Sequence, residues 1–152
     1  MSSDYPVQHV PQTQAMSCWA ASTAMMLGYR NNQSYPEAAV LQQFRDFGTD
    51  GADENESQQL AYRLGFNVVE NACRNAQGWA DMLSHGPVMV GSPTHVIVIA
   101  GVDGEADDSQ ARLKILDPAQ TGEYWGGYQA IEQQYELNPD AGFNTNLFQW
   151  PG

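Results

Sequence analysis

The sequence predicts an α+β fold with a helical front half and a strand-rich back half. Segments between residues 18 and 84 are rich in alanine, methionine, leucine and glutamine, which favour helices. Between residues 88 and 116, β-branched residues gather in short runs, as in buried strands. Helices followed by antiparallel strands are typical of α+β domains. At 152 residues the chain fits one domain, so we expect a single unit over residues 1–152.

The front half holds the expected helices, each with its own end signal. Ser34 is a candidate cap for the second helix, while Gly48 and Gly65 follow the second and third helices as stops. Residues 49–56 are acidic and contain glycine, which predicts an exposed loop. The expected helices cover residues 18–29, 36–47, 56–64 and 76–84, and a short strand is expected at 66–69.

The back half predicts an antiparallel sheet. Residues 95–102 form its most apolar strand, and residues 112–116 alternate as a return strand after the turn residues 103–108. A shorter apolar run precedes this hairpin at 88–90. Glycines and aromatic residues after Gly122 indicate one more strand or extended segment.

Composition excludes several classes of function. The formal charge is −12, and a surface this acidic repels phosphate backbones, so we expect no direct nucleic-acid binding. No apolar run of about 18 residues or more is present, so no membrane span is expected, and no signal peptide is visible. The two cysteines are too few for a disulfide framework. They do not combine with the three histidines at zinc-ligand spacing, so we expect neither metal nor cofactor.

Cys18 opens the predicted helix 18–29, which is a chemically special position. Unpaired N–H groups and the dipole at a helix N-terminus stabilise a thiolate, the reactive form of cysteine. A tetrahedral intermediate also needs donors for its oxyanion. The backbone N–H of Cys18 is one candidate, and the side chain of Gln12, six residues earlier, is another, with Gln14 the weaker choice.

His95 and Asp117 lie where two predicted strands begin and end. His95 starts the most apolar strand, and Asp117 directly follows the return strand. A carboxylate closing the neighbouring strand can accept a hydrogen bond from the imidazole and fix its tautomer. Singly, each residue also fits a structural role. In the order Gln12, Cys18, His95, Asp117 they indicate a thiol-dependent enzyme.

Together these segments resemble the papain-like cysteine peptidases in their compact bacterial form, over roughly residues 5–135. Two branches are closest: the plant-pathogen effector type, also found as toxin modules of secreted bacterial proteins, and the peptidases that process bacteriocins after a double glycine. The resemblance rests on Gln12, Cys18-Trp19-Ala20-Ala21-Ser22, Gly86-Pro87-Val88, His95-Val96-Ile97-Val98 with Gly101, and Leu116-Asp117-Pro118.

The resemblance implies a helical lobe that carries Cys18, packed on an antiparallel sheet lobe that carries His95 and Asp117. By analogy Gln12 belongs to the oxyanion hole, and Trp19 and Trp125 are substrate-side aromatic residues, with Trp125 shielding the bond between His95 and Asp117. Two departures stand out. The second cysteine of the secreted plant enzymes is missing from residues 15–19, and an aspartate replaces papain's asparagine.

The function so implied is a cysteine endopeptidase, delivered or secreted as a bacterial effector or toxin module, that cleaves a cytosolic protein in a target cell. A small-residue cleavage site such as Gly-Gly, and an inhibitory immunity protein in the producing cell, are further expectations. Two alternatives stay open. One is an amidase, deamidase or acyltransferase with the same three residues, and the other is an inactive binding module.

Other candidates have simpler explanations. Cys73 has no histidine near it in sequence and is expected to be a structural thiol. His9 is expected in a loop, and His85 at the end of a helix. The carboxylates at positions 46, 50, 53, 54 and 56 lack the pattern of a calcium loop, so a solvated acidic surface is expected there.

Overall fold

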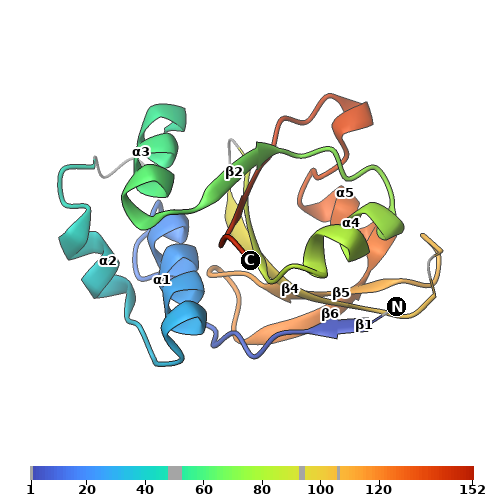
Figure 1. Ribbon diagram of the computed structural model, residues 1–152, viewed down its shortest axis with the longest axis horizontal. Helices are drawn as coiled ribbons and strands as arrows, with labels where there is room; N and C mark the ends of the chain where they lie inside the picture. Colours follow the sequence, from blue (N-terminus) through green and yellow to red (C-terminus); the bar gives the residue numbers. More distant parts are fainter. Residues whose placement is uncertain (1, 48–52, 93–94, 106) are drawn as a thin grey trace.

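A helical lobe and a sheet lobe lie side by side in the computed structural model, which describes residues 2–47, 53–92, 95–105 and 107–152. Figure 1 shows α1, α2 and α3 grouped at one end and the strands, with α4 and α5, at the other. The predicted α+β class is therefore confirmed. The described elements are β1 (Ser2–Asp4), α1 (Cys18–Asn31), α2 (Glu37–Gln43), α3 (Glu54–Leu64), β2 (Asn67–Glu70), α4 (Ala76–Leu83), β3 (Val88–Gly91), β4 (Val96–Asp103), β5 (Arg112–Leu116), β6 (Glu123–Gly127), α5 (Tyr128–Gln134), a 3₁₀ turn (Pro139–Ala141) and β7 (Asn146–Gln149).

All strand pairs in the described residues are antiparallel, in the order β2-β7-β3-β4-β5-β6, with β1 pairing with the end of β4. Successive side chains of a strand point to opposite faces, so the sheet borders two cores. On one face Met89, Val98 and Phe148 pack against α1 and the rest of the helical lobe. On the other face Val90 and Ile97 join the core beneath α4 and α5.

The nucleophile helix α1 is almost entirely buried. Its residues from Trp19 to Leu27 are all shielded from solvent, as the alanine- and methionine-rich composition predicts. The helix ends where Asn32 takes a left-handed conformation (φ 52°) and returns its N–H to the carbonyls of Gly28 and Tyr29. Because α1 is buried and its ends are fixed, Cys18 has a defined place relative to the sheet.

Two glycines have structural reasons that the backbone makes plain. Gly65 ends α3 with φ 84°, a left-handed value that other residues adopt at a cost. Gly101 in β4 allows β1 to pair closely with β4, because a Cβ there would lie 2.7 Å from the backbone oxygen of Ser3. The sequence predicts the first role; the second emerges only from strand pairing.

Several predicted boundaries needed correction. The second helix covers residues 37–43, and its N-cap is Pro36 with no side-chain cap, so Ser34 is not the cap. The acidic loop was wrong for residues 54–56: Asp53 caps α3 by accepting a bond from Glu56 N–H (2.7 Å), and helix begins at Glu54. Residues 49–52, the rest of that predicted loop, and Gly48, the predicted stop of the second helix, lie outside the described residues.

Candidate active site

Cys18 is the first residue of α1 and lies at the partly exposed end of an otherwise buried helix. The first N–H groups of a helix have no partner within it, and they carry its positive partial charge. The first turn of α1 contains no acidic residue that would neutralise this charge. The position therefore favours an anion, and the side chain available to form one there is the thiol of Cys18.

The loop that leads into Cys18 is fastened by Glu37, the first residue of α2. Its buried carboxylate accepts bonds from the Thr13 N–H (3.1 Å), the Thr13 hydroxyl (2.5 Å) and the Ser17 hydroxyl (3.0 Å). The Ser17 hydroxyl oxygen also accepts a bond from the Gln14 N–H (3.2 Å). Glu37 thus holds the N-cap of α1 in place. Sequence reasoning missed it, because a glutamate at the first position of a helix is ordinarily a solvated one.

His95 precedes β4 directly and is held by three bonds to Ser92. The Ser92 N–H and hydroxyl both donate to the His95 carbonyl (2.9 and 3.0 Å), and the His95 N–H donates to the Ser92 hydroxyl oxygen (3.0 Å). Its ring Nε2 lies 2.7 Å from Oδ1 of Asp117, which follows β5 on the adjacent strand. The Cys18 thiol is close enough to the same ring to raise the pKa of His95, with an effect second to that of Asp117. The structure therefore brings the three predicted residues together.

Asp117 is almost fully buried, at 3% exposure, and it is surrounded by donors. Oδ1 also accepts the Ala119 N–H (2.9 Å), and Oδ2 accepts the Tyr135 hydroxyl (2.8 Å). The Tyr135 hydroxyl lies 2.7 Å from that of Tyr124, and the Tyr135 ring is nearly parallel to the His95 ring. Tyr135 thus contacts two members of the set. No sequence signal marked it, since the helix that it follows, α5, was not predicted.

Electrostatics couple the histidine to its neighbours. The hydrogen bond that His95 donates to Asp117, and then the influence of Cys18, raise the pKa of His95 from 6.5 to about 9, against the lowering effect of burial. Burial raises the pKa of Asp117, but the bonds from His95, Ala119 and Tyr135 outweigh it and hold the pKa below its ordinary value. At neutral pH the site therefore contains an aspartate anion and an imidazolium beside Cys18.

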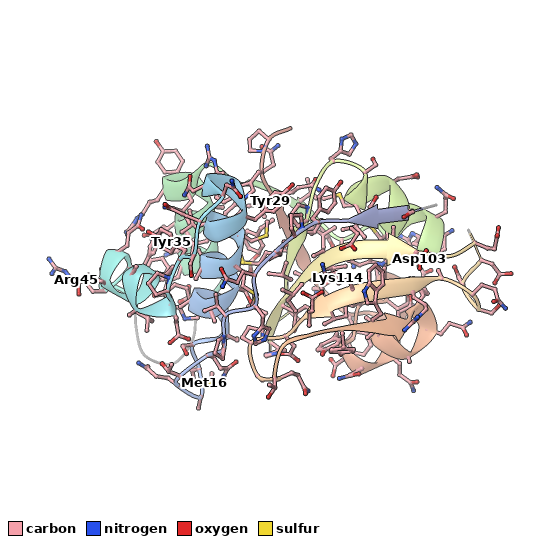
Figure 2. All side chains as sticks on the ribbon, turned by 90° about the horizontal axis from the view of Figure 1, so that it is seen from below. Met16, Tyr29, Tyr35, Arg45, Asp103 and Lys114 are labelled. Carbon is pink, nitrogen blue, oxygen red and sulfur yellow. The ribbon has the colours of Figure 1, made fainter. Side chains whose placement is uncertain are left out.

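The N-terminal loop is tied to the turn that carries Asp117. His9 Nε2–H donates to the Asp117 carbonyl oxygen (2.8 Å), and the Gln12 N–H donates to the Pro118 carbonyl oxygen (3.0 Å). The side-chain amide of Gln12 donates to the carbonyls of Gln14 (2.9 Å) and Ala15 (3.2 Å), and its own Oε1 is buried without a partner among the described residues. Gln12 therefore lies beside the loop before Cys18, with its N–H groups turned into that loop. Met16 stands exposed on the same loop (Figure 2).

Trp19 and Trp125, the two predicted substrate-side residues, lie in different surroundings. Trp19 is buried against Phe44 and Phe47 of the helical lobe, and its edge borders a hollow between the lobes. Trp125 is paired with Lys114 across β5 and β6, and its ring lies close to Gly101. The donor to Asp117 that the structure shows from this region is Tyr135 rather than Trp125.

The remaining candidates lie outside this constellation. Cys73 is buried, and burial together with the charge of Asp81 raises its pKa to about 11. Both cysteines are free thiols. His85 is exposed and follows α4. Within the described residues no cluster of histidine, cysteine or acidic side chains suits a metal ion. The helices described here include none with the length and apolarity to cross a bilayer.

The chain is similar to known cysteine proteases in sequence and in fold. The family model described as papain-like cysteine protease AvrRpt2 matches residues 1–136. Among solved structures, UfSP from C. elegans aligns with the whole of this chain, with a TM-score of 0.64 and 16% sequence identity. This chain spans 35% of that UfSP chain, so the likeness concerns the fold. No curated protein sequence matches.

Proposed function

This chain belongs to the papain-like cysteine protease AvrRpt2 family and is a papain-like cysteine peptidase, and from that premise we propose that Cys18 is its nucleophile, His95 its general acid and base, and Asp117 the residue that orients the imidazole. The observation that carries the proposal is the position of His95. Its Nε2 is 2.7 Å from a buried carboxylate, and the thiol of the nucleophile helix is close enough to the same ring to raise its pKa. This is the arrangement that activates a cysteine.

The geometry supports an ordinary acyl-transfer sequence on a protein substrate. His95 holds the proton of the Cys18 thiol, and the thiolate attacks the scissile carbonyl to form a tetrahedral intermediate. The imidazolium then protonates the leaving amine, the C–N bond breaks, and an acyl-thioester remains on Cys18. Water, deprotonated by His95, hydrolyses the thioester and restores the thiol.

The oxyanion donors in this proposal are the Cys18 backbone N–H and the Gln12 side chain. The unpaired N–H groups at the start of α1 support the first donor. Gln12 lies beside the same loop, and its amide would have to release the carbonyls of Gln14 and Ala15 to face an oxyanion. We therefore propose that substrate binding turns this side chain.

The biological role we propose is that of an effector or toxin module. The resemblance to plant-pathogen effector proteases, in which Cys18, His95 and Asp117 all have counterparts, supports a module that a bacterium secretes or delivers into a target cell. Its substrate there is a cytosolic protein, cut at a small-residue site such as Gly-Gly. The producing cell then needs an inhibitor, and the charge of −12 supports a basic face on this immunity protein. The same charge supports the absence of nucleic-acid and membrane partners.

A cysteine-directed peptidase probe tests the proposal first. Rapid labelling is expected at Cys18, and it is expected to disappear in Cys18→Ala and to fall strongly in His95→Ala. Cys73→Ala and His85→Ala are matched controls that should label like the wild type. Equal, slow labelling of both cysteines, indifferent to His95, would leave a binding module instead.

Mass spectrometry of a treated lysate then identifies the reaction. New protein N-termini that appear with the wild type and not with Cys18→Ala support a peptidase. Side-chain deamidation or acyl transfer without new N-termini would favour the alternative reactions of the same site.

A further inference from the structure

The hollow between the lobes is lined by sequence neighbours of the proposed nucleophile and of its histidine. It measures about 590 Å³. Trp19, the residue after Cys18, forms one side, while Ser92, which bonds His95, and Val96, which follows it, form another. A peptide rises about 3.3 Å per residue when extended, so a side chain entering this hollow belongs to a residue within about two positions of the scissile bond.

Part of the wall of the hollow is apolar. Met89 and Phe148 of the sheet and Leu60 of α3 line it, and each is at most 3% exposed. Thr23 of α1 directs its hydroxyl to the Met89 sulfur (3.7 Å) and so adds little polarity. Such walls suit the aliphatic stem of a long side chain.

The rim of the hollow is acidic. Asp53 and Glu54 at the start of α3, and Glu70 at the end of β2, approach it from two different elements. Within the described residues, none of these carboxylates forms an ion pair with an arginine or lysine. The rim therefore concentrates negative charge that the protein itself does not neutralise.

A second, independent feature is the hydroxyl of Thr145 in the wall. Thr145 is only 2% exposed, and its Oγ1 has no hydrogen-bond partner among the described residues. A buried hydroxyl without a partner is unfavourable, and a donor carried in by a ligand relieves it. Apolar wall residues, acidic rim residues and a buried hydroxyl without a partner together suit a long side chain with a cationic end.

We propose that this hollow is a specificity site for a basic residue of the substrate, with arginine preferred over lysine. The aliphatic stem lies along Met89 and Phe148, and the cationic head meets Glu54 and Glu70 at the rim. A guanidinium has five donors in a planar fork, so it can bond carboxylates from separate elements and still donate to a hydroxyl, whereas an ammonium is a single point charge. The proposal rests on the proposed peptidase function for its position in the substrate.

Binding to the Cys18→Ala protein tests the site without requiring catalysis. N-acetyl-arginine amide and N-acetyl-citrulline amide have the same shape and differ in charge, and NMR follows the indole of Trp19 and the methyl groups of Met89 and Thr145. Arginine is expected to bind about tenfold more tightly than citrulline, because its hydrogen bonds to the carboxylates are charge-assisted. This preference should fall as salt is raised.

Matched variants locate the effect. Glu54→Gln with Glu70→Gln should abolish the preference for arginine, whereas Glu105→Gln, which removes one charge from the exposed β4–β5 turn, should preserve it. Thr145→Val should weaken arginine binding and raise the melting temperature, since it deletes a buried hydroxyl without a partner. Equal binding of arginine and citrulline, or a preference that survives the double variant, overturns the proposal.

Digestion of a proteome-derived peptide library by the wild-type protein separates the two proposals. Cleavage with arginine or lysine enriched within two positions of the cut supports both. Cleavage without such enrichment keeps the peptidase and overturns the basic site. Arginine-selective binding with no cleavage of any peptide supports the site and refutes the peptidase.

Discussion

Replacing Asp117 by asparagine tests the electrostatic core of the site with little change in shape. The carboxylate is the largest cause of the raised pKa of His95, through the bond of 2.7 Å to Nε2. Asparagine keeps the size and one acceptor oxygen but removes the charge. The pKa of His95 is therefore expected to fall from about 9 toward 6.5.

The size of the effect follows from the fraction of His95 that is protonated. At pH 8 a histidine of pKa about 9 is about 90% imidazolium, and one of pKa 6.5 is about 3% imidazolium. Peptide hydrolysis needs the imidazolium to protonate the leaving amine, so kcat/KM should fall by up to about 30-fold at pH 8 but only about fourfold at pH 7. These are upper limits, because the contact with Cys18 remains and also raises the pKa.

Two measurements check this expectation. The alkaline limb of the kcat/KM profile, taken with the best peptide from the library, should lie near pH 9 in the wild type and move to lower pH in Asp117→Asn. An NMR titration of the three histidines, with His95 assigned through His95→Gln, reads the same pKa without a substrate. Asp103→Asn at the exposed end of β4 is the matched control. An alkaline limb and a His95 pKa that stay in place in Asp117→Asn would refute the reasoning.

Three further changes probe the supports of the site. Tyr135→Phe removes the hydroxyl bonded to Asp117 and should lower the free energy of unfolding by about 1.5–3 kcal/mol, measured by urea denaturation; an unchanged midpoint would mean that the bond contributes nothing. Glu37→Gln removes the charge that anchors the loop before Cys18 and should reduce kcat/KM about tenfold with KM nearly constant, since the loss of about 1.4 kcal/mol falls on positioning. Alkylation of the native protein at pH 8 should leave Cys73 unmodified until urea is added, because its pKa is about 11; peptide mass mapping would expose the opposite result.

The fold was predictable where a signal is local. The composition of residues 18–29 favours a helix, and α1 begins at Cys18 as expected. The hairpin of β4 and β5 also follows from β-branched runs around a turn, and the predicted return strand 112–116 has the observed bounds.

The missed elements depend on distant partners. β7 pairs with β2 and β3, and its four residues Asn-Leu-Phe-Gln form no pattern of their own. β1 consists of Ser-Ser-Asp, which lacks strand-forming side chains, and it exists because β4 offers an edge beside Gly101. α5 starts immediately after Gly126 and Gly127, whose turn character conceals the helix that follows.

The candidate site divides in the same way. Cys18, His95 and Asp117 are recognisable because each stands at the end of a predicted element and because their order resembles a family. Glu37 and Tyr135 act across the fold, on Ser17 and on Asp117, and only packing brings these pairs together. Positioning residues of this kind have no motif, so the sequence identifies the chemistry more readily than its supports.

The only lysine of the chain, Lys114, has a buried position in the sheet (Figure 2). Its ammonium pairs with Asp4 (2.8 Å) and Glu123 (3.1 Å) and donates to the Tyr5 carbonyl (3.0 Å), and its side chain is 7% exposed. Enzymes that acetylate, methylate or ubiquitinate proteins act on accessible lysine amines. The folded sheet therefore keeps the one lysine amine of this sequence out of their reach until the strands around it open.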